Sequence, residues 1–402
     1  MPYGRGRNFI SACIVLLVIM QEVGCQPHPT DHTVFDVKNF NAVADGTEDD
    51  AMALIRAWVA ACGSGAAAKV LIPPGNFMAS EVLFAGPCTA TKPIIVEIQG
   101  TLLANTDLSS YSQGAWISIE RVDGLLLTGP GTIDGRGKSV WKYGTDSDLP
   151  LLPVALSVKS VENAKVGDLK FVNSMGFHLE VTDSKNIDIS KVGITAPGDS
   201  PFTHGIHLTN STNIKITDSV IGTGDDCVSI GYSTQSILVA GVTCGPGHGL
   251  SVGSLGKLVD ETNVNGITVT NCTLIKTKNG ARIRSYHDSP KIEATNIVFE
   301  HLVMEGVQNP ILIDQHYNSK DNSQESSVRL SDIHFRDISG TSISPISINL
   351  NCSSLVPCEK VELADINLKP FDSTIQQLTS ACSNAQIITQ GQIIPSMPNR
   401  CT

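Results

Sequence analysis

Ionisable residues recur at a constant interval in the middle of this chain. His204, Asp226 and His248 follow one another at intervals of 22 residues, and Asp225 directly precedes Asp226. A carboxyl group or an imidazole can donate or accept a proton in a reaction if the fold brings it within hydrogen-bond reach of the reacting group. The interval therefore indicates acid–base chemistry, provided that the fold places these residues together.

The elements that could position them follow from a repeat of short strands. A polar residue followed by alternating apolar residues recurs at steps of 23 to 36 residues, and most copies have a second short strand upstream. Period-two alternation is typical of β-strands, and one-directional repeats of this length predict an all-β fold, a right-handed parallel β-helix. A β-propeller or β-sandwich would require tight antiparallel hairpins, whose signals are scarce. The copies begin at Asn186, Asn213, Ser236, Gly266, Asn296, Asp332 and Lys360.

Stacking of such coils turns a sequence interval into a distance of about 4.8 Å per coil. His204, Asp226 and His248 then form one column, which we expect at a turn where Gly205 and Gly249 rotate the side chains outward. The segment from Asp49 to Cys62 has the apolar spacing of a helix, and we expect a short N-terminal helix there that covers the end of the core.

A second column faces outward beside the first. It contains His207, Ser229, Ser251 and Arg282, and Arg284 follows two residues later. Arginine binds anionic groups through a planar, permanently charged fork. Two arginines beside two aspartates therefore indicate an anionic ligand held over a carboxylate pair.

The N-terminus has the layout of a secretory signal. Arg5 and Arg7 precede an apolar run from Phe9 to Met20, which is short for a membrane span. We expect residues 1–25 to be a signal peptide and residues 26–402 to be a single parallel β-helix catalytic domain, secreted as a monomer. A membrane anchor is the alternative for the N-terminus; no other apolar run approaches ~18 residues, so no membrane contact is expected after cleavage.

Cysteine usage agrees with export. The spacing predicts four disulfides and contains no C-x-x-C metal pattern, and it leaves Cys272 unpaired. Three N-x-S/T sequons are candidate glycosylation sites, at Asn210, Asn271 and Asn351. The expected disulfides are Cys62–Cys88, Cys227–Cys244, Cys352–Cys358 and Cys382–Cys401.

The charge of the chain limits its partners. The formal net charge is −11, and without a basic face to displace counterions nucleic acid is excluded as a partner. An anionic substrate would have to be held by a few local cations against the general field.

Three segments together resemble the signature of the polygalacturonases, family 28 of the glycoside hydrolases. They are G-D-D at 224–226, G-H-G at 247–249 and R-I-R at 282–284. The resemblance runs from Val34 through I-D-Q-H-Y at Ile313 to the C-terminal cysteines, and is greatest to the plant pollen-type exopolygalacturonases. It implies a secreted, cell-wall enzyme that hydrolyses α-1,4-linked galacturonate in pectin, an acidic polysaccharide. It also implies inversion, with neither a metal nor another cofactor.

The resemblance implies a role for Asp225 and for both residues of the first column other than His204. Asp225 is similar to the general acid, and Asp226 to one of two carboxylates that activate water. His248 resembles the histidine that keeps the acid protonated and oriented. Inverting pairs are commonly about 6.5 to 9.5 Å apart, which leaves room for the water.

Substrate contacts are implied further along the chain, and one motif departs from the family. Arg282 resembles the arginine that binds the substrate carboxylate, Arg284 stands where the family usually has lysine, and Tyr317 matches a tyrosine of the subsite. The family's Asn-Thr-Asp motif is replaced by F-T-H at Phe202–His204. The second water-activating carboxylate is therefore absent.

Three interpretations of His204 remain open. A neutral His204 acts as base together with Asp226, since an ordinary histidine pKa of about 6.5 permits that role. Alternatively, Asp226 acts alone at a reduced rate, or the protein binds pectin without hydrolysing it.

Two rival functions belong to other classes. A pectate lyase would share the fold but would need a calcium site with several acidic oxygen ligands, for which only Asp225 and Asp226 are placed. A purely adhesive role in the cell wall would retain pectin binding without releasing reducing ends.

Overall fold

The structure is a computed structural model that describes residues 32–144, 152–319 and 325–401. The signal peptide predicted over residues 1–25 lies outside these residues. No helix within the described ranges has the length and apolar character needed to cross a membrane.

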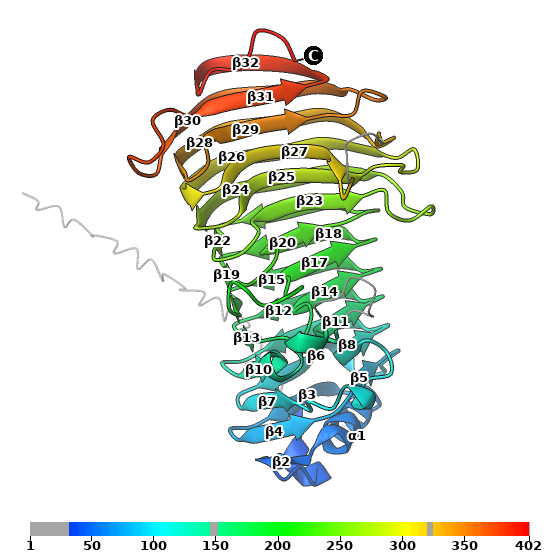
Figure 1. Ribbon diagram of the computed structural model, residues 1–402. Helices are drawn as coiled ribbons and strands as arrows, with labels where there is room; N and C mark the ends of the chain where they lie inside the picture. Colours follow the sequence, from blue (N-terminus) through cyan, green and yellow to red (C-terminus); the bar gives the residue numbers. More distant parts are fainter. Residues whose placement is uncertain (1–31, 145–151, 320–324, 402) are drawn as a thin grey trace, which may run out of the picture. The chain divides into compact units, whose positions relative to one another are not determined.

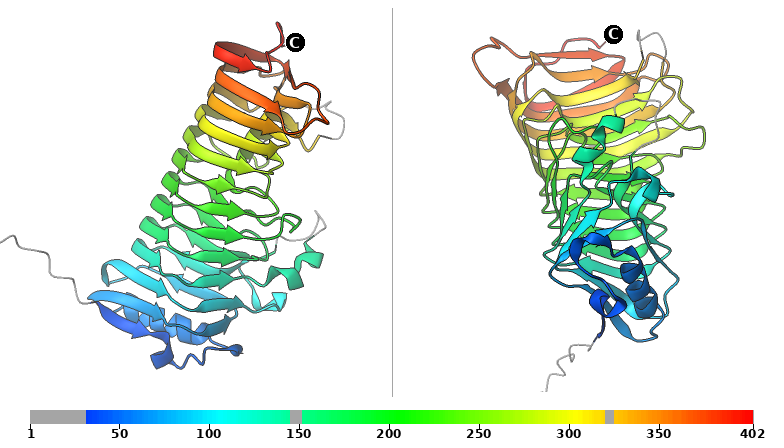
Figure 2. Two further views of the ribbon diagram at one scale, coloured as in Figure 1. Left: turned by 90° about the vertical axis from the view of Figure 1, so that its left-hand side faces the viewer. Right: turned by 60° about the horizontal axis from the view of Figure 1, so that its bottom comes forward.

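The described chain from His32 onward is a right-handed parallel β-helix, as the repeat predicts. Strands of successive coils stack in parallel, rung over rung (Figures 1 and 2). The upstream strands of the repeat form a sheet of eleven strands, which carries the site. In spatial order these are β5 (Val82–Ala85), β8 (Ala115–Glu120), β11 (Val154–Lys159), β14 (Leu179–Thr182), β17 (Ile206–Thr209), β20 (Val228–Ile230), β23 (Leu250–Leu255), β25 (Asn279–Tyr286), β27 (Asn309–Tyr317), β29 (Ile346–Asn351) and β31 (Thr379–Ser383).

A larger sheet forms the remaining faces from two ladders that merge. One ladder contains β1 (Thr33–Asp36), β3 (Ala67–Ile72), β6 (Thr91–Ile98), β9 (Asp123–Thr128), β12 (Glu162–Gly167), β15 (Lys185–Ser190), β18 (Thr212–Thr217) and β21 (Gln235–Ala240). The other contains β2 (Asp45–Asp49), β4 (Asn76–Ala79), β7 (Thr101–Ala104), β10 (Thr132–Asp134), β13 (Lys170–Val172), β16 (Gly193–Thr195), β19 (Val220–Gly222) and β22 (Thr243–Cys244). Both pair with β24 (Val264–Ile275), which is followed by β26 (Glu293–Val307), β28 (Arg329–Ser342), β30 (Cys358–Pro370) and β32 (Ala385–Ile394).

Columns of aliphatic side chains fill the interior because alternate residues of each strand point inward. One column on the smaller sheet is buried throughout, with each member paired in register to the next. It consists of Leu179, Ile206, Val228, Leu250, Ala281, Ile311 and Ile348. This stack gives the site a rigid floor.

The predicted capping helix is confirmed as α1 (Ala51–Cys62). It buries Leu54 and Trp58, and the Trp58 ring stacks on Phe84 of β5 with centroids 5.0 Å apart. Four short 3-10 helices complete the described elements. They are η1 (Val37–Phe40), η2 (Leu108–Ser110), η3 (Gly137–Ser139) and η4 (Trp141–Tyr143).

All four predicted disulfides form, and Cys272 is free and buried. Burial raises the pKa of the Cys272 thiol to about 11, which keeps it unreactive. Of the three sequons, Asn210 and Asn271 are exposed and Asn351 is half-buried.

Candidate active site

Backbone pairing brings both predicted columns together on the smaller sheet. β17 pairs with β20, and β20 with β23, each at the offset of 22 residues that the sequence predicts. His204, Asp226 and His248 therefore occupy equivalent positions in three successive coils. The second column is paired rung by rung through His207, Ser229, Ser251 and Arg282.

The first column lies in the turns before the strands, as expected, but the two glycines act differently. Gly249 has φ of 95°, in the left-handed region that favours glycine. Gly205 is not in that region, so the expectation that it rotates His204 outward is wrong. Instead it permits a close approach between coils, since a Cβ there would lie 2.4 Å from the carbonyl oxygen of Cys227.

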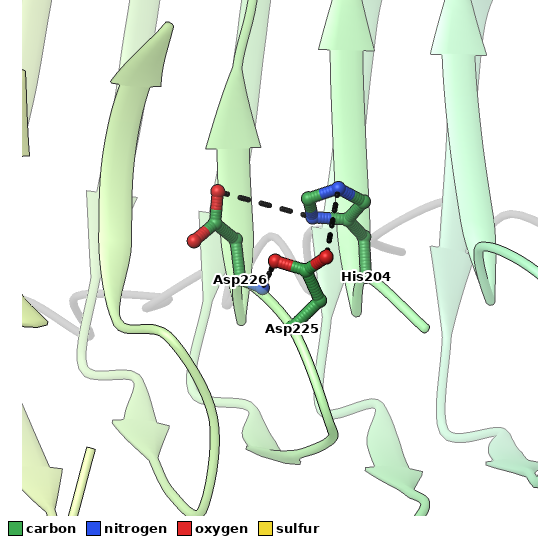
Figure 3. A group of neighbouring side chains, drawn as sticks. All are labelled: His204, Asp225 and Asp226. Carbon is green, nitrogen blue, oxygen red and sulfur yellow. Dashed lines mark hydrogen bonds and ion pairs between the residues drawn. The ribbon is translucent and has the colours of Figure 1, made fainter. Parts of the chain in front are cut away.

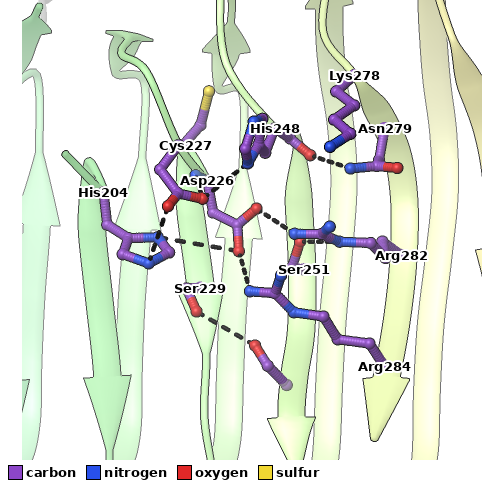
Figure 4. A network of polar contacts seen from close by, with 12 residues as sticks. His204, Asp226, Cys227, Ser229, His248, Ser251, Lys278, Asn279, Arg282 and Arg284 are labelled. Atoms are coloured by element: carbon purple, nitrogen blue, oxygen red, sulfur yellow. Dashed lines mark hydrogen bonds and ion pairs between the residues drawn. The ribbon is translucent and has the colours of Figure 1, made fainter. Parts of the chain in front are cut away.

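Asp226 is fully buried, which corrects the expectation that the whole first column turns outward. Its Oδ1 accepts a hydrogen bond from Nη2 of Arg282, and its Oδ2 accepts one from Nη2 of Arg284 at 2.8 Å (Figure 4). The two arginines are themselves only 6% and 7% exposed. Paired guanidinium groups offset the cost of burying the carboxylate. Because both oxygens are engaged, Asp226 alone is poorly placed to activate water.

Asp225 contacts an imidazole at each of its two oxygens. Nδ1 of His248 donates to Oδ1 at 2.9 Å, and Nε2 of His204 lies 3.7 Å from Oδ2 (Figure 3 shows the His204 contact). Burial alone would raise the pKa of the Asp225 carboxyl. The charge of His204, the hydrogen bond and charge of His248 and the charge of Arg284 outweigh burial and hold that pKa well below its ordinary value. Asp225 is therefore ionised in the unliganded site.

The main chain of His204 is held by a hydrogen bond, while its buried Nδ1 makes none with the described residues. Its Nδ1 lies 3.9 Å from Oδ2 of Asp226 and has no hydrogen-bond partner among the described residues. The buried ring of His178 donates from Nδ1 to the carbonyl of His204 at 2.9 Å and accepts the backbone N–H of Ser174 at Nε2. Burial lowers the pKa of His178 to about 4. His178 thus fixes the turn as a neutral group.

Aromatic rings surround His204 on one side. The Phe177 ring meets His204 edge-on, with centroids 4.5 Å apart, and lies 4.9 Å from the ring of His207. Burial, followed by the charges of His204 and Arg284, lowers the pKa of His207 to about 3. His207 is therefore neutral over the pH range in which most proteins are stable.

These groups line a single pocket of about 550 Å³. The guanidinium of Arg284 lies 4.8 Å from the ring centroid of Tyr317, a cation–π contact that orients both. Burial raises the pKa of Tyr317, so its hydroxyl stays neutral. Of the residues predicted to be catalytic or substrate-binding, those that line the pocket are His204, Asp225, His248, Arg282, Arg284 and Tyr317. Asp226 lies buried behind the two arginines.

The two carboxylates are closer than the separation common to inverting pairs. One ligand atom each of His204, Asp225 and Asp226 lie within 4.8 Å of one another, whereas inverting pairs are commonly about 6.5 to 9.5 Å apart. The ligand atoms of this trio are close enough together to hold a metal ion, and no other group of three such residues is found among the described residues. Two guanidinium groups on Asp226 oppose a divalent cation there, and imidazole is a poor ligand for calcium.

Several residues in or beside the pocket escaped the sequence analysis. Lys278 lines the pocket, and the Asn279 amide donates to the carbonyl of His248 at 3.0 Å. Both belong to the coil where the interval lengthens from 22 to 31 residues, so the constant spacing could not identify them. Phe177 and His178 lie before His204, where the interval of 22 residues begins. The alternating pattern of β14 was the one sequence feature that could have indicated them.

Comparison with known proteins places the chain in a family. The model of Glycosyl hydrolases family 28 matches residues 62–391. The chain is 41% identical over 372 residues to an exopolygalacturonase of Arabidopsis thaliana, which covers 90% of this chain and 87% of that protein. It is 40% identical over 365 residues to an exopolygalacturonase of Zea mays, with 89% and 88% covered.

Solved structures share the fold at lower identity. An exopolygalacturonase from Thermotoga maritima superimposes with a TM-score of 0.75 at 17% identity, covering 90% of this chain and 92% of that one. An endo-xylogalacturonan hydrolase from Aspergillus tubingensis gives 0.77 at 24% identity, covering 89% and 100%. The family match and the two plant relatives show that this chain belongs to family 28 of the glycosyl hydrolases.

Proposed function

We propose that the protein hydrolyses α-1,4-galacturonosyl bonds of polygalacturonate, with inversion and without a metal. The observation that carries this proposal is a cationic pocket around one carboxylate, in a chain whose net charge is −11. Lys278, Arg282 and Arg284 concentrate positive charge beside Asp225, which favours an anionic sugar over a neutral one at that position. The names of the two plant relatives support the same substrate class.

Asp225 is the proposed general acid, and His248 supplies its proton. The unliganded carboxylate is ionised, but a bound galacturonate excludes water and adds a negative charge near Arg284. Both effects raise the pKa of Asp225. A proton shared between Nδ1 of His248 and Oδ1 of Asp225, 2.9 Å apart, could then pass to the leaving oxygen.

His204 is the proposed base, in place of the missing carboxylate. Its ring lines the pocket, and its Nε2 lies 3.7 Å from Oδ2 of Asp225 without a hydrogen bond, whereas its Nδ1 is buried. A water bound at Nε2 of the neutral ring would therefore find an acceptor there. Asp226 is buried with both oxygens on arginines, so it positions Arg282 and Arg284 rather than deprotonating the water.

The remaining elements of the proposal concern location and mode of action. We propose that residues 1–25 direct secretion, that residues 26–402 act as one monomeric catalytic domain in the cell wall, and that cleavage is exo. The four disulfides support an oxidising compartment, and the two plant relatives named exopolygalacturonases support the mode of cleavage.

A second candidate function is pectin binding without hydrolysis. The ionised state of Asp225 favours it, because a carboxylate that stays unprotonated cannot serve as an acid. Assays of polygalacturonate for new reducing ends separate the two candidates. Hydrolysis predicts release by the parent protein, and proton NMR of the first product should show the β-anomer that inversion yields. Binding with no release would support the second candidate.

A further inference from the structure

The pocket is electrically divided along the stacking axis, with Asp225 between its two parts. The coils of β25 and β27 contribute the cationic side, which consists of Lys278, Arg282, Arg284, Tyr286 and Tyr317. The turn before β14 and the coil of β17 contribute the aromatic side, consisting of Phe177, Phe202, His204 and His207. Figure 4 shows His204 and the two arginines on opposite sides of Asp226.

The aromatic side lacks a partner for a sugar carboxylate. Among the described residues, those that line the pocket from the β14 and β17 coils include no lysine or arginine; Lys257 and Glu261, of opposite charge, also line the pocket but follow β23. His207 is neutral, and the half-buried carboxyl of Glu180 stands beside it in register. A galacturonate carboxylate placed here would lose water without gaining a counter-charge, which is unfavourable.

Phe202 has a backbone conformation that the surrounding turn must impose. It is 40% exposed and has φ of 53°, and it is the one phenylalanine among the described residues in the left-handed region. Side chains other than glycine, asparagine and aspartate adopt that region at a cost. The surrounding turn must therefore hold Phe202 in place.

The turn is fastened to the coil that carries Asp225. Oγ1 of Thr203 accepts the backbone N–H of Gly224 at 3.1 Å and lies 2.6 Å from Oγ of Ser200. A Cβ on Gly224 would lie 1.9 Å from the carbonyl oxygen of Ser200, so the two coils touch at this point. These contacts hold the turn that carries Phe202, which lines the same pocket as Asp225.

We propose that the aromatic side binds an uncharged sugar unit while the cationic side binds a free galacturonate. This inference rests on the proposed hydrolysis of galacturonan and narrows its substrate to chains in which acid and uncharged units are neighbours. A galacturonate methyl ester is the uncharged unit that differs least from the acid. Its ring and methyl group can pack on aromatic faces.

The test compares initial rates and binding on three polymers of equal length, using the full chain. They are polygalacturonate, the same polymer partly methyl-esterified, and the same polymer partly reduced to neutral galactose units. We expect the initial rate and the binding affinity to be about tenfold higher for the two polymers that contain uncharged units than for polygalacturonate. A preference for the ester alone identifies the ester as the ligand, and equal preference identifies the absence of charge as the determinant.

Phe202→Asn is the informative variant, because asparagine tolerates the left-handed region. The fold should persist with an unchanged or higher thermal midpoint, and the preference for uncharged units should fall. Phe371→Asn is the matched control, since Phe371 is 48% exposed just after β30 and does not line the pocket. It should leave the preference unchanged.

Equal or faster cleavage of fully acidic polygalacturonate by the parent protein would overturn this inference and leave the proposed hydrolysis intact. If no polymer is cleaved, the hydrolysis proposal fails, and binding of the same three polymers still decides the inference. An unchanged preference in Phe202→Asn would also contradict it.

Discussion

Nε2 of His204 lies 3.7 Å from Oδ2 of Asp225, although the two residues belong to different coils. The opposite oxygen of the same carboxylate accepts a hydrogen bond from His248 at 2.9 Å. One carboxylate therefore lies between two imidazoles, while Asp226 lies between two guanidinium groups. The two aspartates of G-D-D are thus set apart electrostatically, and only Asp225 remains available to a substrate.

Asp225→Asn should abolish most of the hydrolysis, because an amide cannot protonate the leaving oxygen. Loss of one acid–base contribution typically lowers kcat by about 100 to 10,000-fold, and binding of polygalacturonate should persist because the arginines remain. Reducing-end assays and titration calorimetry measure the two effects. Asp337→Asn, which removes an exposed carboxylate that pairs with His301, is the control. A rate in Asp225→Asn that equals the parent's would exclude Asp225 as the acid.

Arg282→Met should destabilise the protein more than its substrate contacts explain. It leaves the buried carboxylate of Asp226 with one fewer counter-charge, which costs about 3 to 5 kcal/mol when a buried pair is broken. Adding Asp226→Asn should recover a large part of that loss, since the unpaired charge is then gone. Denaturant titrations of the single and double variants provide the measurement.

The control for this cycle is Arg329→Met, whose side chain is 48% exposed in a surface ion pair with Glu293 and Glu359. Exposed pairs contribute little, so its unfolding midpoint should barely move. Independent, additive losses from Arg282→Met and Asp226→Asn would show that the two side chains are not coupled.

Stability should fall on acidification from about pH 6.5, where exposed histidines ionise, toward pH 4. The folded-state pKa of His178 is about 4, below the about 6.5 of an exposed histidine, so the unfolded chain binds the extra proton between these values. The stabilisation is complete above about pH 6.5 and is lost as the pH falls toward 4. His178 alone accounts for about 3 kcal/mol, and His207 shifts in the same direction.

Unfolding titrations between neutral and mildly acidic pH measure this slope. His178→Asn should flatten it, whereas His301→Asn should not, because a hydrogen bond to Asp337 raises the pKa of His301 instead. A free energy of unfolding that is independent of pH in the parent would refute the assignment of His178 as a buried neutral group.

The fold was predictable because its signals are local and repeated. Alternation in segments such as 186–189 defines the strands, and the interval of 22 residues fixes how β17, β20 and β23 pair. The capping helix likewise follows from the spacing of apolar residues, and all four disulfides follow from the spacing of cysteines.

The sequence predicted most of the residues that form the site but not the contacts between them. Alternation says which side of a strand a residue takes, but not that Arg282 and Arg284 would each donate a hydrogen bond to Asp226. That choice depends on burial and on the balance of charges from three coils. The support of His204 by His178 is similarly invisible, because it joins a backbone carbonyl to a side chain 26 residues away.

The most direct test of the account is the release of reducing ends from polygalacturonate by the parent, His204→Ala and His204→Asp. If His204 is the base, the parent releases ends, His204→Ala is slowed about 100-fold or more, and His204→Asp remains active. A silent parent that is rescued by His204→Asp would contradict the account and identify a disabled enzyme. An active parent whose rate is unchanged in His204→Ala would rule out His204 as the base.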